Sequence, residues 1–98
     1  MSRPANPVRG EAEIAGIALR PSFAALVAAE AELGSLFALV DRAAQGQLEL
    51  REMVALFWHC RMTDSIDRAD FADTVTAAGL AAAAPVLRQL LRQILTGR

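Results

Sequence analysis

The chain has 98 residues, of which 54% are hydrophobic, and much of this fraction is alanine, so one domain with a modest core is expected. All ten strongly basic residues are arginines, and the formal net charge of −1 argues against a broad nucleic-acid-binding surface. The single cysteine excludes an internal disulfide and favours a reducing compartment, and no apolar run approaches the ~20 residues that span a bilayer. We therefore expect a cytoplasmic protein that does not enter a membrane.

The sequence begins with a segment that predicts a tail. Residues 1–8 are expected to be disordered, because Pro4 and Pro7 remove backbone donors that a helix or a β-ladder would need. Residues 9–98 are expected to form a single domain.

An alternating pattern after the tail predicts a two-stranded antiparallel β-hairpin. Apolar residues alternate with other residues from Glu11 to Arg20, and Gly16 interrupts the pattern. Gly16 supplies the positive φ that a tight turn requires, so Ala15 and Gly16 are expected to form the loop. Such a hairpin is marginal alone in water, so it must rest on the helices or pair with another chain.

The rest of the chain has helical periodicity. Ser22 and Ser35 are expected N-caps of the first two helices, and glycines mark several helix ends. The expected helices cover Phe23–Leu33, Leu36–Gln45, Leu50–Met62, Asp67–Ala78 and a last helix with Pro85 in its first turn. The predicted fold class is α+β, an N-terminal two-stranded antiparallel β-hairpin packed on four to five short α-helices.

Because alanine contributes little burial energy, the large side chains are expected to form the core. In the first two helices the side chains expected to face inward are Phe23, Leu26, Val27, Glu30, Leu33, Leu36, Phe37, Leu39, Val40 and Ala43. Core positions are also expected at Phe57, Trp58 and Phe71.

The last helix carries the strongest amphipathic pattern. Its expected apolar face is Val86, Leu87, Leu90, Leu91, Ile94 and Leu95. Its expected polar face is Arg88, Gln89, Arg92 and Gln93. This helix either closes the core or leaves part of its apolar face for a partner helix.

No set of residues in the sequence predicts a catalytic, cofactor or metal site. His59 and Cys60 are the only residues of their types, too few for a zinc site or for an activated thiol, so a core cysteine beside a boundary histidine is expected. The aspartates at positions 64, 67, 70 and 73 lack the pattern of a calcium loop. Glu30 is expected to form an ion pair with Arg51 or Arg20.

The order of short motifs is similar to that in a known family. The segments that carry the likeness are Asn6-Pro-Val-Arg-Gly-Glu, Leu19-Arg-Pro-Ser-Phe-Ala-Ala-Leu, Glu30-Ala-Glu-Leu-Gly-Ser-Leu, Leu48-x-Leu-Arg, Met53-Val-Ala-Leu-Phe-Trp, Ala78-Gly-Leu and Pro85-Val-Leu-x-x-Leu-Leu. In this order they resemble the small gene transfer agent family proteins of phage tail modules in alphaproteobacteria, from Asn6 to Gly97. That family is described as tail-tube associated or as a tail assembly chaperone.

The resemblance implies a non-catalytic chaperone that binds the tape measure protein and keeps it soluble until the tail tube protein polymerises around it. The partner surface is expected on the last helix, at Leu87, Arg88, Leu91, Arg92 and Ile94. Homo-oligomers through the hairpin edge or the last helix are a further expectation. Three alternatives stay open. The first is a structural component of the tail tube, the second is a small helical DNA-binding regulator, which the near-neutral charge disfavours, and the third is a small enzyme, which the single histidine and cysteine disfavour.

Overall fold

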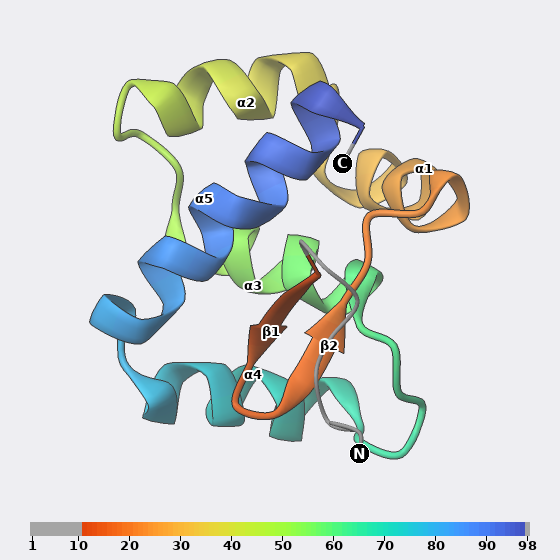
Figure 1. Ribbon diagram of the computed structural model, residues 1–98, viewed down its shortest axis with the longest axis vertical. Coiled ribbons are helices and arrows are strands. Elements are labelled where there is room, and N and C mark those ends of the chain that lie inside the picture. Colours follow the sequence, from red (N-terminus) through yellow and green to blue (C-terminus); the bar gives the residue numbers. More distant parts are fainter. Residues whose placement is uncertain (1–10, 98) are drawn as a thin grey trace, which may run out of the picture.

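The computed structural model describes residues 11–97 as a two-stranded hairpin and five helices, which confirms the predicted α+β class (Figure 1). The predicted tail, residues 1–8, lies outside the described residues. The elements are β1 (Ala12–Ile14), β2 (Ile17–Leu19), α1 (Phe23–Leu33), α2 (Leu36–Ala44), α3 (Leu50–Cys60), α4 (Arg68–Ala78) and α5 (Leu80–Thr96).

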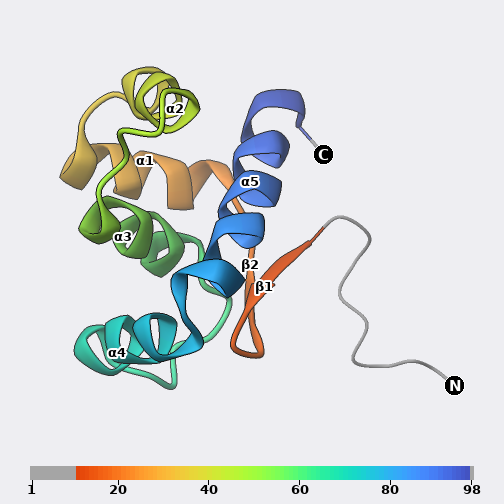
Figure 2. The ribbon, with the colours of Figure 1, turned by 90° about the vertical axis from the view of Figure 1, so that its left-hand side faces the viewer.

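The elements form two sides of the molecule (Figure 2). Helices α2, α1, α3 and α4 follow one another down one side, and α5 and the hairpin lie on the other. The core between them is formed by the buried residues Ala12, Ile14, Leu19, Ala29, Leu39, Met53, Val54, Leu56, Phe57, Cys60, Phe71, Val75, Ala83 and Leu90. Five of these come from α3, which is therefore the central helix.

The hairpin forms as the alternation predicts. Ala12 pairs with Leu19 and Ile14 with Ile17, so these four side chains share the face that packs on the core. Ala15 and Gly16 have φ angles of 51° and 80°, as a two-residue turn of the primed type requires.

A segment after α3 pairs with the outer edge of β2. Arg20 donates its backbone N–H to Cys60 (2.8 Å), and Met62 donates to Ala18 (2.9 Å). The predicted third helix continues to Met62, but α3 ends at Cys60, because Arg61 adopts an extended conformation and bridges Leu19. This edge of the hairpin is thus occupied, and edge pairing with another chain would have to use β1.

The predicted caps and most helix ends are confirmed. The Ser22 and Ser35 hydroxyls accept hydrogen bonds from Ala25 and Ala38, and Asp67 caps α4. In contrast, α5 begins at Leu80, so Pro85 lies inside the helix and not in its first turn. The run of alanines before Pro85 favours helix strongly enough to extend it toward Gly79.

The predicted packing of α1, α2 and α5 needs several corrections. Phe23 and Phe37 are 84% and 83% exposed, and Val27, Glu30 and Leu95 are exposed as well. Helix α1 instead faces α3 with Ala25, Ala29 and Leu33, because alanines spaced by four residues let the helix axes approach closely. In α5, Gln93 is buried, although the pattern assigns it to the polar face.

No single helix within residues 11–97 is long and apolar enough to cross a bilayer. The helix pairs α1–α2 and α4–α5 would be, by length and composition alone, but each pair is sharply bent.

Candidate functional site

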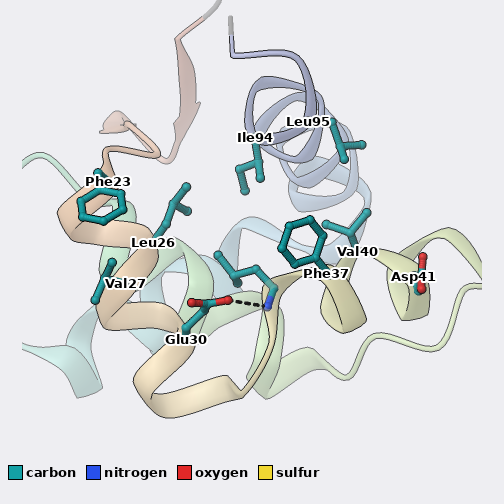
Figure 3. Close-up of a pocket in the computed structure, with 10 residues that line it drawn as sticks. Phe23, Leu26, Val27, Glu30, Phe37, Val40, Asp41, Ile94 and Leu95 are labelled. Carbon is teal, nitrogen blue, oxygen red and sulfur yellow. Dashed lines mark hydrogen bonds between the residues drawn. The ribbon is translucent and has the colours of Figure 1, made fainter.

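The most distinctive surface feature of the described residues is an apolar groove of about 570 Å³ between α1, α2 and the C-terminal end of α5 (Figure 3). We call it the α1–α2–α5 groove. Its lining residues are Phe23, Leu26, Val27, Glu30, Leu36, Phe37, Val40, Asp41, Ile94 and Leu95.

The groove exists because α1 and α2 diverge. The chain turns by 79° between them, and Gly34 takes a φ of 84° at the corner, which favours glycine. Helix α5 then closes the open side: Ile94 points toward the space between Leu26 and Phe37 (Figure 3). Helix α2 is further held to α3 by an ion pair between Arg42 and Glu52.

Phe23 and Phe37 are the most exposed large apolar side chains among residues 11–97, and both line the groove. Each lies in the first turn of its helix. Phe23 directly follows the N-cap Ser22, and Phe37 comes two residues after the N-cap Ser35. Apolar surface gathered in one concave place, with a polar surround, is typical of a protein interaction site.

Two acidic residues line the groove, and the structure corrects the expected partner of one of them. Within residues 11–97, Glu30 forms no ion pair with an arginine. Its Oε2 accepts a hydrogen bond from the backbone N–H of Leu36 (3.1 Å), at the start of α2. The two expected arginine partners have other acids, since Arg20 binds Glu11 (3.3 Å) and Arg51 binds Glu49 (3.0 Å). Glu30 therefore fixes the α1–α2 corner, where the helix dipole favours a negative charge.

The residues expected to bind a partner on the last helix fall into three groups. Ile94 lines the groove. Leu87 and Leu91 are half-buried and pack against the core, whereas Arg88 and Arg92 are exposed. The last helix thus both closes the core and presents part of its apolar face at the groove.

A second cluster joins α1, α3 and α4 by polar contacts. Glu32 accepts a hydrogen bond from Arg68 through Oε2, and its Oε1 lies 2.8 Å from Nε2 of His59. Arg68, followed by His59, holds the pKa of the Glu32 carboxyl at about 2. These contacts join three helices around a partly buried network, and we interpret them as structural.

The Trp58 ring extends this cluster and places Arg61 beside the core. The guanidinium of Arg61 lies 3.3 Å from the ring centroid, and the Phe71 ring meets Trp58 edge to face at 5.6 Å. Cys60 is buried as expected, and burial raises the pKa of its thiol to about 12. Among the described residues no group of histidines, cysteines and acids could hold a metal ion.

The sequence interpretation missed the groove because it assigned Phe23, Phe37 and Val27 to the core. A usable signal was present: Ala25, Ala29 and Leu33 form a second stripe on α1, at a spacing of four residues. Two stripes on one helix predict two neighbouring surfaces. The stripe with Ala29 packs on the core, and the stripe with Phe23 lines the groove.

One comparison with known proteins found a match. The model of the family described as "Phage tail tube protein, GTA-gp10" matches residues 10–97, which is nearly the whole chain. No curated protein and no solved structure matches.

Proposed function

The chain belongs to the phage tail tube protein, GTA-gp10, family, and from this membership we propose that it is a non-catalytic tail assembly chaperone of a phage-like gene transfer agent. In this role it binds the tape measure protein in the cytoplasm of the host cell and keeps it soluble. Tail tube protein then displaces it as the tube polymerises. Such binding needs accessible apolar surface and no reactive group.

The α1–α2–α5 groove is the observation that carries this proposal. Three helices leave an apolar channel open beside two almost fully exposed phenylalanines, Phe23 and Phe37. Keeping such side chains in water exposes the free protein to non-specific association, so their presence is most simply explained by a partner that covers them.

A structural subunit of the tail tube is the second candidate, and the printed description of the family favours it. Tube subunits usually build rings from long strands. Here the strands have three residues each, and residues 60–62 already occupy the outer edge of β2. This arrangement supports a chaperone better than a ring-forming subunit.

Co-expression with the tape measure protein tests the proposal. The native chain should raise the soluble yield of that protein, and the double variant Phe23→Ser, Phe37→Ser should lose most of the gain. Both side chains are exposed, so the free energy of unfolding should change by no more than about 0.5 kcal/mol.

The matched control is Leu80→Ser. Leu80 is 64% exposed and also starts a helix, but it lies outside the groove. An equal loss of soluble yield in the control, or no loss in the double variant, would contradict the groove as the binding site. Accumulation of the chain in purified particles at the level of a tube subunit would favour the second candidate.

The remaining residues of the expected surface on α5 have a test of their own. Arg88 and Arg92 are exposed, so Arg88→Glu, Arg92→Glu should leave the fold intact. Loss of tape measure binding in this variant would show that the partner surface continues from Ile94 along α5. Unchanged binding would limit it to the groove.

A further inference from the structure

The charge of the α1–α2–α5 groove indicates what kind of segment it holds. Its walls are apolar, its charged lining residues are Glu30 and Asp41, and no basic residue among positions 11–97 lines it. We propose that the groove holds an amphipathic helix of the partner whose apolar stripe is flanked by lysine or arginine. This inference rests on the proposed function and specifies the segment that the chaperone grips.

The construction of the walls favours a helix over an extended peptide. Every lining residue belongs to α1, α2 or α5, and helices present no continuous row of free backbone groups like that of a strand edge. A peptide that binds as a β-strand needs a strand edge to pair its backbone, and the part of the chain described here offers none at the groove. A helix satisfies its backbone internally and needs only apolar contacts and charge pairing.

The position of the two acids sets the spacing of the basic residues. The carboxylate of Glu30 is held at Leu36 by its hydrogen bond, and Asp41 lies five residues further along α2 (Figure 3). At the helical rise of about 1.5 Å per residue, this is a separation of about 7.5 Å along the axis. On a partner helix, basic side chains four residues apart share one face and span a similar distance of about 6 Å along the axis.

Binding of two model peptides tests the inference. Each peptide has about 18 residues, enough for a helix, and the same leucine stripe. One carries pairs of lysines at i and i+4 beside the stripe, and the other carries glutamates at the same positions. Their affinities for the native full chain are measured by titration calorimetry at low and high salt.

We expect the lysine peptide to bind roughly three- to tenfold more tightly at low salt, since exposed ion pairs each contribute little. High salt should reduce the difference. The variant Glu30→Gln, Asp41→Asn should remove the preference while the peptides still bind. The glutamine carbonyl can still accept the N–H of Leu36, so the corner of the fold is preserved.

The other possible results of the peptide titrations contradict either the inference alone or the proposed use of the groove as well. Equal binding of both peptides, or a preference for the glutamate peptide, overturns the inference while leaving the groove as a binding site, provided that Phe37→Ser weakens both. Binding of neither peptide, or binding that Phe37→Ser leaves unchanged, overturns the inference and removes support for the proposed use of the groove.

Discussion

Ala29 is fully buried where α1 meets α3, whereas Phe23, six residues earlier on the same helix, is 84% exposed. A small side chain permits the close approach of two helices, and the resulting contact determines which face of α1 remains outside. Because alanine contributes little burial energy, the free energy of folding depends mainly on Phe57, Phe71 and the leucines of the core. Full burial contributes about 1.5–3 kcal/mol for each such side chain.

Glu32 should make the stability of the protein depend on acid pH. Its folded pKa of about 2 lies below the ordinary value of 4.5, so the stabilisation is fully present above about pH 4.5 and is lost as the pH falls through 2. Glu32→Gln should cost about 1 kcal/mol or less at neutral pH, because solvent screens the pair, and almost nothing once the pH is well below 2.

Urea unfolding of the native chain and Glu32→Gln at several pH values measures this difference. Arg68→Gln, which removes the main partner of Glu32, should reproduce the pH profile of Glu32→Gln. A stability difference that stays constant from neutral pH down to 2 would show that the ion pair is not its source.

Cys60 should resist thiol reagents while the protein is folded. The side chain is 1% exposed, and burial raises its pKa to about 12, so little thiolate exists at about pH 8. Its rate of reaction with an aromatic disulfide should follow the rate of unfolding. Ala28→Cys in a Cys60→Ala background places a thiol on the exposed side of α1 and should react at once. Equal rates for the two thiols would contradict the buried position of Cys60.

At the scale of elements, the turn of the hairpin carries strain that a single substitution relieves. Ala15 has a φ of 51°, a conformation that costs an L-residue with a Cβ roughly 1–2 kcal/mol, and its side chain is exposed. Ala15→Asn should therefore raise the free energy of unfolding by about 0.5–1 kcal/mol, since asparagine tolerates this region.

The same substitution inside a helix provides the control. Ala28→Asn on the exposed face of α1 should lower the free energy of unfolding by about 0.5 kcal/mol, because asparagine is a poorer helix former than alanine. Chemical denaturation measures both variants. Destabilisation of similar size at both positions would contradict the turn geometry.

The sequence predicts the elements well because their signals are local. The serine caps, the alternation around Gly16 and the helical stripes of α3, α4 and α5 place all seven elements, most of them within two residues. The start of α5 differs because four alanines outweigh the proline signal, and the end of α3 differs because Arg61 joins the hairpin. That pairing joins residues distant in sequence and has no local signature.

The candidate site is less predictable, since it depends on how the helices pack. Of the residues expected to bind a partner on the last helix, Ile94 lines the groove, and their role in binding stays a prediction. The exposed position of Phe23 and Phe37 follows from the rotation of α1 toward α3 and from the 79° turn to α2. A hydrophobic pattern indicates which side chains share a face but not whether another helix covers that face.

At the scale of the whole molecule, a packed core and a groove occupy different places. Helices α3 and α4, the hairpin and most of α5 enclose the core. Helices α1 and α2 and the C-terminal end of α5 form the groove at one end of the molecule (Figure 1). The proposed chaperone has to bind and then release the tape measure protein, and a groove that is open on one side and packed on the core suits that role.

Site-specific photo-crosslinking during tail assembly tests whether the tape measure protein occupies the α1–α2–α5 groove before the tube forms. Phe37 is replaced by a photoreactive phenylalanine analogue, which its exposed position should accommodate, and Leu80 is replaced in the same way as the control. We expect crosslinks from position 37 to the tape measure protein before the tube closes, and few from position 80. Crosslinks from position 37 only to tube subunits in finished particles, or tape measure crosslinks equally strong from position 80, would contradict this expectation.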